Sequence, residues 1–225
     1  MKSLIYPVFL VSLFMAAQQV QAQGDVRFSG HAGVALPNSE FGDDDFSDDD
    51  SGLAAPGLTV GIKLTKPLGD NGFGLFGGID VMYNPLQADA RDDIEDANPD
   101  TDFTFFRYIT VPLSAGFDYH FDAGDGVQLF GQAGIAFSFV KVTNFVRDDE
   151  FEELTSTHEL ANNVGFTIGA GAVINDHIIV GLSLFNLGDH DIDGETESSE
   201  FTDTNEFDFE QSISTLNLTV GIMFN

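Results

Sequence analysis

The chain has 225 residues, of which 37 are Asp or Glu and only 8 are Lys or Arg, so its formal net charge is −29. It contains no Cys, which excludes a disulfide scaffold, thiol catalysis, thiolate metal sites and lipid attachment through an N-terminal Cys. The charge argues against nucleic acid as a partner, and 23 Phe with 43% hydrophobic residues argue against a disordered acidic chain.

The first segment of the chain has the pattern of a secretory signal peptide. Lys2 supplies a positive charge, an apolar stretch covers residues 4–17, and Val20-Gln21-Ala22 is a small-residue cleavage pattern. We therefore expect residues 1–22 to be removed on secretion and residues 23–225 to form one domain. The apolar stretch is shorter than the about 20 residues that a membrane-spanning helix needs.

Eight later segments alternate apolar residues with small or polar residues at a period of two, as β-strands do. In chain order they are residues 26–36, 58–65, 73–83, 109–120, 127–139, 164–174, 177–184 and 215–224. In the second segment, for example, Leu58, Val60 and Ile62 share one face, and Thr59 and Lys63 share the other. A strand of about ten residues is long enough to cross a bilayer at a tilt.

The acidic residues are concentrated between these segments. Residues 37–54, 84–104, 141–161 and 188–210 hold 7, 7, 6 and 10 Asp and Glu, or 30 of the 37. These long stretches alternate with short connections at residues 67–72, 122–126 and 175–176. Long loops at one end and tight turns at the other are typical of up-and-down barrels in bacterial outer membranes.

The fold that follows is all-β: an eight-stranded antiparallel up-and-down transmembrane β-barrel. In lipid every backbone donor must be paired, so strands cross only as a closed sheet, with an apolar outer face and a small, polar inner face. A soluble lipocalin-like barrel has the same alternation with its apolar face inside. The signal peptide and the difference between loops and turns favour the membrane barrel, with both termini in the periplasm and four acidic loops outside the cell.

Parts of the sequence resemble the outer-membrane β-barrel proteins common in Bacteroidetes-type bacteria. Phe106-Arg107-Tyr108-Ile109-Thr110-Val111-Pro112-Leu113 is similar to that family's aromatic–Tyr–x–x–(Val/Ile)–Pro–Leu strand opening. Gly169-Ala170-Gly171, followed by Asn175-Asp176-His177 and Val180-Gly181-Leu182-Ser183, looks like its penultimate hairpin. The architecture is similar to the OmpA/OmpX class.

The resemblance implies a location in the outer membrane and contact with outer-membrane lipid. It also implies that the barrel-assembly machinery recognises the C-terminal strand. The chain departs from the usual terminal aromatic residue by ending Phe224-Asn225. Recognition would therefore depend on Phe224 and the alternating residues before it.

Several charged residues fall on the inner face of the predicted barrel. Arg27, Lys63 and Asp118 lie at similar depth, with His120 and Gln128 nearby. They form either a gated proton or ion path or a structural plug that neutralises buried charge, and the plug is the expectation we favour. An eight-stranded barrel is filled by its own side chains, whereas general diffusion porins have about 16 to 18 strands.

No motif indicates catalysis. Gly72-Phe73-Gly74-Leu75-Phe76-Gly77 fits a dinucleotide-binding pattern, but a strand follows it where a helix would be needed. His120, His158, His177 and His190 could act as general bases, but none has a Ser and a carboxylate at a persuasive spacing. We expect the protein not to be an enzyme.

The last acidic stretch contains a calcium-loop pattern. Residues 189–200 satisfy D-x-D-x-D-G-x5-E, in which oxygen atoms at set positions bind Ca²⁺. The candidate ligands are the side chains of Asp189, Asp191, Asp193 and Glu200 and the backbone carbonyl of Glu195. The flanking segments are not helical, and Thr196 stands where an aliphatic residue is usual, so a solvated acidic loop is the alternative.

These observations favour a non-enzymatic outer-membrane barrel with a structural or surface-interaction role. Its four acidic extracellular loops would contact cations, matrix or partner proteins. The alternatives are a narrow transport or secretion-accessory barrel and, less favoured, a lipid-modifying outer-membrane enzyme. Apart from Ca²⁺ we expect no cofactor.

Overall fold

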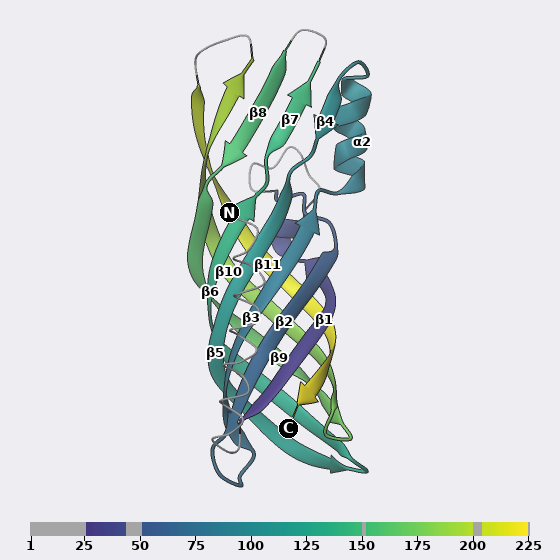
Figure 1. Cartoon of the computed structure of the whole chain (residues 1–225), viewed down its shortest axis with the longest axis vertical. Helices are drawn as coiled ribbons and strands as arrows, with labels where there is room; N and C mark the ends of the chain where they lie inside the picture. The colour runs from purple at the N-terminus through teal and green to yellow at the C-terminus, as the bar shows by residue number, and fades with distance from the viewer. Residues whose placement is uncertain (1–25, 44–50, 150–151, 200–203, 225) are drawn as a thin grey trace, which may run out of the picture.

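The computed structural model describes residues 26–43, 51–149, 152–199 and 204–224, most of which lie in one antiparallel sheet (Figure 1). The predicted signal peptide, residues 1–22, lies outside the described residues. The strands are β1 (Arg27–Pro37), β2 (Gly57–Pro67), β3 (Phe73–Pro85), β4 (Asp102–Thr104), β5 (Arg107–Gly124), β6 (Val127–Val142), β7 (Phe145–Asp148), β8 (Glu153–His158), β9 (Leu160–Ile174), β10 (Ile178–Ser198) and β11 (Asn205–Phe224). The helical segments are the 3-10 turn η2 (Ser39–Gly42) and the α-helix α2 (Ala88–Ala97).

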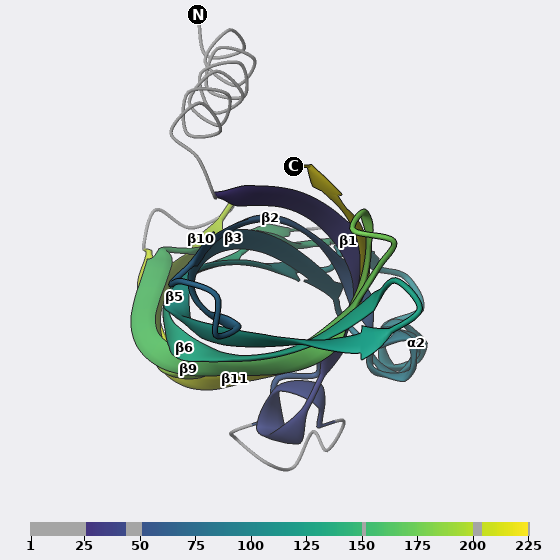
Figure 2. The same cartoon turned by 90° about the horizontal axis from the view of Figure 1, so that it is seen from below.

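Eight long strands close into a barrel. β1, β2, β3, β5, β6, β9, β10 and β11 each pair antiparallel with the next, and β11 pairs back with β1. Figure 2 is turned by 90° from Figure 1 and shows the closed ring. The predicted eight-stranded antiparallel up-and-down barrel is confirmed. Each of its strands includes most of one predicted segment, and β10 and β11 extend well beyond theirs.

The outer face of the ring is apolar, as the alternation predicts. Leu58, Phe117 and Ile135 leave 64%, 64% and 67% of their surface exposed, and in a membrane barrel lipid covers this surface. On the inner face the side chains are small or polar, and Thr59 and Asp118 there are buried. The period-two pattern therefore assigns lipid-facing and lumen-facing residues correctly.

The two ends of the barrel differ in length and structure. Short connections join β2 to β3, β5 to β6 and β9 to β10 at one end, which we call the turn end, and β1 begins and β11 finishes there. In the last of these connections Asn175 and Asp176 have φ angles of 49° and 62°, the left-handed conformation that a tight two-residue hairpin requires. The opposite end, at the top of Figure 1, is the loop end.

The acidic stretches at the loop end contain more regular structure than the sequence predicts. Residues 84–104 include α2 and β4, and residues 141–161 include β7 and β8. β10 and β11 continue as a paired hairpin past the barrel, so a loop over residues 188–210 is wrong. β4, β7, β8 and the hairpin form the outer sheet. Neither α2 nor any other helix within the described ranges has the length and apolarity needed to cross a membrane.

A β-bulge in β10 changes which residues face inward. The pairing of β10 with β11 shifts register between Asn186 and Gly188, and Gly188 has a φ of 73°, which a Gly adopts without strain. Before the bulge Phe185 and Leu187 are the buried residues, and after it His190 and Ile192 are. The acidic residues that alternate with His190 and Ile192 therefore point to solvent.

Candidate functional site

Polar side chains from three strands meet near the turn end of the lumen. The imidazole of His120 lies 3.2 Å from the carboxylate of Asp118 and 3.1 Å from the amide oxygen of Gln128. The guanidinium of Arg27 donates to the same amide oxygen at 3.1 Å. These contacts join β1 to the β5–β6 hairpin across the barrel interior.

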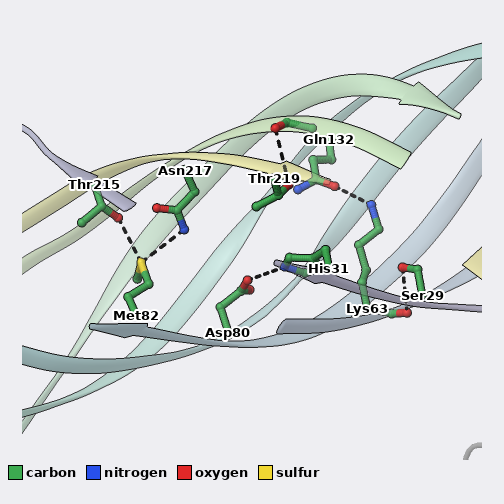
Figure 3. A network of polar contacts seen from close by, with 10 residues as sticks. Ser29, His31, Lys63, Asp80, Met82, Gln132, Thr215, Asn217 and Thr219 are labelled. Atoms are coloured by element: carbon green, nitrogen blue, oxygen red, sulfur yellow. Dashed lines mark hydrogen bonds and ion pairs between the residues drawn. The ribbon is translucent and has the colours of Figure 1, made fainter. Parts of the chain in front are cut away.

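Lys63 lies in the middle of the lumen, where it reaches from β2 toward Gln132 of β6 (Figure 3). Its ammonium donates to the amide oxygen of Gln132 at 2.6 Å. The same nitrogen lies 4.7 Å from the ring centre of Phe130 and 5.5 Å from that of Phe76. An amide oxygen and two ring faces therefore hold this buried cation.

Deeper in the lumen His31 and Asp80 form a close pair. The Nε2 atom of His31 lies 2.6 Å from the Oδ1 atom of Asp80 (Figure 3). Gly61 lies between them in the sheet, and a Cβ there would come within 2.5 Å of the Asp80 oxygen and 2.6 Å of the His31 nitrogen. The missing side chain at position 61 is what lets the pair form.

The fixed charges of the lumen balance one another. Among the described residues inside the barrel they are two cations and two carboxylates, Arg27, Lys63, Asp80 and Asp118, which lie on the inner faces of β1, β2, β3 and β5. A charge taken out of water is costly unless it is compensated. Balanced charge is the arrangement that keeps a filled barrel interior stable.

The lumen is open at the turn end and narrows further in. A cavity of about 870 Å³ enters at the turn end and is lined by Arg27, Asp118 and His120 among others. The space around Lys63 and Asp80 measures only about 60 Å³. That is room for a few water molecules.

Apolar side chains close the lumen at the loop end. This apolar plug consists of Phe41, Met82, Tyr108, Val140, Val142, Phe185, Leu187, Ile192 and Ile213, together with smaller residues. The ring of Phe41 packs edge-on against that of Tyr108, with centres 5.0 Å apart. The Tyr108 hydroxyl donates to the carbonyl oxygen of Gly52 at 3.0 Å. These contacts therefore fix Phe41 and Gly52, which lie between β1 and β2 in the sequence, at the mouth of the barrel.

A Ser–His pair lies beside the apolar plug. The hydroxyl of Ser138 lies 2.8 Å from Nε2 of His190, and Nδ1 of His190 donates to the carbonyl oxygen of Gly188 at 3.1 Å. Burial lowers the pKa of His190, although the Gly188 carbonyl and the charges of Asp189 and Asp191 act in the opposite direction. Both side chains are fully buried, whereas a nucleophilic Ser must reach substrate and its His is oriented by a carboxylate. The pair stabilises the junction between β6 and β10.

His158 lies in an aromatic environment on the inner side of the outer sheet. Its ring centre is 5.6 Å from that of Phe207, 6.1 Å from that of Phe209 and 6.5 Å from that of Phe106. Burial lowers its pKa, and the nearby ammonium of Lys141 lowers it further. The aromatic side chains continue the apolar plug into the outer sheet.

The other side of the outer sheet carries rows of carboxylates. Three directly opposed residue pairs of the β10–β11 hairpin consist of two acids each: Asp191–Glu210, Asp193–Asp208 and Glu195–Glu206. All six side chains are exposed. Like charges directly opposite one another destabilise an antiparallel pair. The outer sheet is therefore a surface at which a cation would relieve repulsion.

The candidate calcium ligands lie on a strand. Asp189, Asp191, Asp193 and Glu195 are alternate, exposed residues of β10, so neighbours in this row are about 6.6 Å apart along the strand. Glu200 lies outside the described residues. Within the described ranges, no group of three or more His, Asp or Glu residues is placed to hold a metal ion. The expected loop conformation is wrong, and calcium binding stays a prediction.

Sequence reasoning found the inward-facing charges and missed some of their partners. Arg27, Asp118, His120 and Gln128 come together as predicted, with Lys63 deeper in the lumen. The His31–Asp80 pair was missed, although both residues pair with Gly61 in the register of β1, β2 and β3. The register of these three strands was the signal from which the His31–Asp80 pair could have been predicted.

The comparisons with known proteins agree with this architecture. The family model described as outer membrane protein beta-barrel domain matches residues 8–224. No curated protein matches the chain significantly. The chain is similar to a major outer membrane protein from Thermus thermophilus, with 12% identity, a TM-score of 0.55, and coverage of 89% of this chain and 99% of that one.

The chain is also similar to two further solved structures. OprG from Pseudomonas aeruginosa is 12% identical with a TM-score of 0.46, and the match covers 88% of this chain and 96% of that one. Neisserial surface protein A is 15% identical with a TM-score of 0.44 and coverage of 89% and 96%. At such identities the likeness concerns the fold alone. The family model spans nearly the whole chain, and the protein therefore belongs to the outer membrane protein β-barrel domain family and resides in the outer membrane.

Proposed function

We propose that the protein is a non-enzymatic, closed barrel that presents its acidic outer sheet to cations and cationic partners outside the cell. The observation that carries this proposal is the row of opposed carboxylate pairs on the β10–β11 hairpin. A paired hairpin holds these charges close together, so a bound external cation would relieve their repulsion. A partner would bind this surface through lysine- or arginine-rich patches of its own, or through bridging metal ions such as Ca²⁺.

The orientation of the barrel follows from the difference between its ends. In outer-membrane barrels the short turns face the periplasm and the long segments face the outside. The loop end carries α2, the outer sheet and the acidic stretches. We place this end outside the cell, and β11, which finishes at the turn end, at the side where the barrel-assembly machinery would bind it.

A narrow transport barrel is the second candidate. The cavity of about 870 Å³ at the turn end favours it, because charged side chains line its wall. The apolar plug at the other end opposes it, because Phe41 and Tyr108 fill the mouth of the barrel. A lipid-modifying enzyme is disfavoured, because the Ser138–His190 pair is fully buried.

Orientation is tested by labelling single Cys variants on intact cells with an impermeant maleimide. Cys at Glu197 of the hairpin or Asp92 of α2 should react, since both positions are exposed at the loop end. Cys at Asp70, in the connection between β2 and β3, should react only after the outer membrane is opened. The reverse pattern would show that the acidic outer sheet faces the periplasm.

The interaction surface is tested by binding of poly-lysine to the purified protein in lipid nanodiscs. The variant Asp191→Asn/Asp193→Asn/Asp208→Asn should bind more weakly, because it removes carboxylates from the opposed pairs of the hairpin. The variant Asp92→Asn/Asp93→Asn/Asp96→Asn on α2 changes the net charge equally and should bind nearly as well as wild type. An equal loss in both variants would mean that only total charge matters.

A further inference from the structure

In the apolar band of the barrel, the charged residues at the described outward-facing positions are cations. Along the outward-facing positions of β1, β2, β3, β5, β6 and β9, and of residues 178–187 of β10 and 212–224 of β11, the charged side chains are Lys66, Arg107 and Lys141. Beyond those bounds β10 and β11 carry the exposed acids of the outer sheet. Lys66 lies at the turn end, and the other two lie at the loop end. In a chain with 37 acids and 8 bases, cations border the apolar band on β2, β5 and β6, which departs from the overall charge of the chain.

Arg107 and Lys141 lie on adjacent strands and face the same way. The backbone N–H of Arg107 donates to the Thr143 hydroxyl at 2.9 Å, and the N–H of Thr143 donates to the Arg107 carbonyl at 2.9 Å. Arg107 is therefore opposite Thr143, while Lys141 is opposite Ile109. Lys141 and Arg107 are diagonal neighbours on one face, with Cα atoms about 7–8 Å apart, so both side chains can reach one anion.

Neither cation is neutralised by a carboxylate of the described chain. The ion pairs between described residues are His31–Asp80, His120–Asp118 and Arg147–Asp149. Lys141 donates to the backbone carbonyl of His158, which leaves two of its three ammonium hydrogens for another acceptor. Arg107 is exposed. In so acidic a protein, cations without an acidic partner indicate an anion that comes from outside the chain.

The surface next to the two cations is apolar. Leu160 is paired with Lys141 across the sheet and leaves 59% of its surface exposed. The rings of Phe137 and Phe139 pack edge-on on the same outward face of β6, with centres 4.9 Å apart. A ligand bound here meets positive charge at the edge of the band and hydrocarbon-facing side chains directly beside it. That combination fits a lipid with an anionic headgroup.

We propose that Arg107 and Lys141 bind the phosphate of an outer-leaflet lipid headgroup, with the Thr143 hydroxyl between them. The leaflet follows from the orientation proposed above, whereas the lipid contact follows from the outward-facing cations. The guanidinium supplies two parallel N–H donors to phosphate oxygens, and the ammonium supplies a point charge. The acyl chains of the lipid lie along Ile109, Phe139 and Leu160.

The proposal is tested by native mass spectrometry of the purified protein titrated with lipid A, a phosphorylated glycolipid. Arg107→Gln/Lys141→Gln should weaken binding about 10-fold or more, because each cation near an anionic lipid surface contributes to attraction. Lys66→Gln/Arg91→Gln changes the charge equally and should bind as wild type does. Arg107→Lys/Lys141→Arg should retain most of the binding. A heat-dependent gel shift checks that each variant is a folded barrel.

Three outcomes would overturn the proposal. An equal loss of lipid A binding in the two Gln double variants would show that binding depends on total charge and not on this pair of residues. Unchanged binding in Arg107→Gln/Lys141→Gln would show that lipid A binds elsewhere. Displacement by inorganic phosphate at the concentration that lipid A requires would indicate a free-anion site. Because this titration does not depend on which end faces outward, its failure is distinguishable from a failure of the labelling experiment.

Discussion

The Nε2 atom of His190 lies 2.8 Å from the hydroxyl oxygen of Ser138, and both side chains are fully buried. This contact joins β10, just after its bulge, to β6 in the barrel wall. It adds a side-chain contact at the level where β10 and β11 continue from the barrel into the outer sheet. A change in the charge of His190 would therefore act on the outer sheet before it acted on the barrel.

Acidification should loosen the outer sheet. The pKa values of His190 and His158 are lowered from the ordinary 6.5, chiefly by burial, so between the folded and unfolded values the unfolded state binds more protons. Their stabilising contribution is present above about pH 6.5 and is lost as the pH falls through the lowered folded values. Hydrogen exchange corrected for intrinsic rates should show residues 188–198 losing protection between pH 7.5 and 5.5.

The control for this measurement is the barrel part of the same strand. Residues 178–184 pair with β9 and β11 in the ring and should keep their protection. His190→Gln removes one titrating group and should reduce the pH dependence. A uniform loss of protection along β10 would contradict the idea that the outer sheet opens by itself.

Removal of the lumen cation should destabilise the whole barrel. Lys63→Met leaves the buried carboxylates of Asp80 and Asp118 with less compensation, and breaking a buried charge arrangement from one side costs about 3–5 kcal/mol. The free energy of unfolding, measured by urea titration in phospholipid vesicles, should fall by this order. Lys63→Met/Asp118→Asn should recover at least half of the loss.

Lys66 provides the matched control, because it is exposed at the turn end. Lys66→Met removes the same charge and should change the free energy of unfolding by less than about 0.5 kcal/mol. If Lys63→Met unfolded at the same urea concentration as wild type, the buried charges would not be acting as a balanced set.

The apolar plug should keep the barrel closed to ions. Wild-type protein in planar bilayers should show no stable conductance. Replacement of residues 39–52 by a short Gly-Ser linker removes Phe41 and the carbonyl of Gly52 that accepts the Tyr108 hydrogen bond, and small single-channel steps should appear. Deletion of residues 89–97 of α2 is the control and should leave the protein without conductance. Large stable channels in the wild-type protein would contradict a closed lumen.

Calorimetry in detergent can show which carboxylates of the hairpin segment bind calcium. Asp193 and Asp208 are directly opposed on the hairpin, so Asp193→Asn/Asp208→Asn should weaken calcium binding. The calcium-loop pattern instead requires Asp189 and Glu200, so complete loss in Asp189→Ala/Glu200→Ala with a saturable wild-type site would support that pattern. If both variants bind as wild type does, calcium is not a ligand of this segment.

The sequence predicted the barrel well because lipid imposes a strict rule on it. Strands such as β2 and β9 must alternate apolar and polar residues, and the alternation is visible without any structure. The polar lumen was partly predictable for the same reason, since Lys63 and Asp118 stand at inward positions. Their partners depend on register between strands, which one strand's pattern does not contain.

The loop end was harder to predict because other forces shape it. Phe41 lies in an acidic stretch, so composition indicated a solvated loop where the structure has an apolar contact with Tyr108. In β10, a bulge at Gly188 moves Asp189 to the outside and His190 to the inside. The bulge interrupts the period-two alternation of the sequence at this point. Without a visible strand pattern, the segment resembles a calcium loop.

The bulge also makes the tolerance of β10 to changes in length uneven. Deletion of Gly188 would remove the extra residue of the bulge and leave Leu187, His190 and Ile192 facing inward. Deletion of a residue beyond the bulge, such as Ile192, would turn the carboxylates of Asp193 and Glu195 toward the aromatic interior of the outer sheet. Insertions within residues 200–203, by contrast, leave the pairing of both strands untouched. Across homologous chains, loss of a single residue between His190 and Thr196 should therefore be rarer than length variation of several residues in the neighbouring connection.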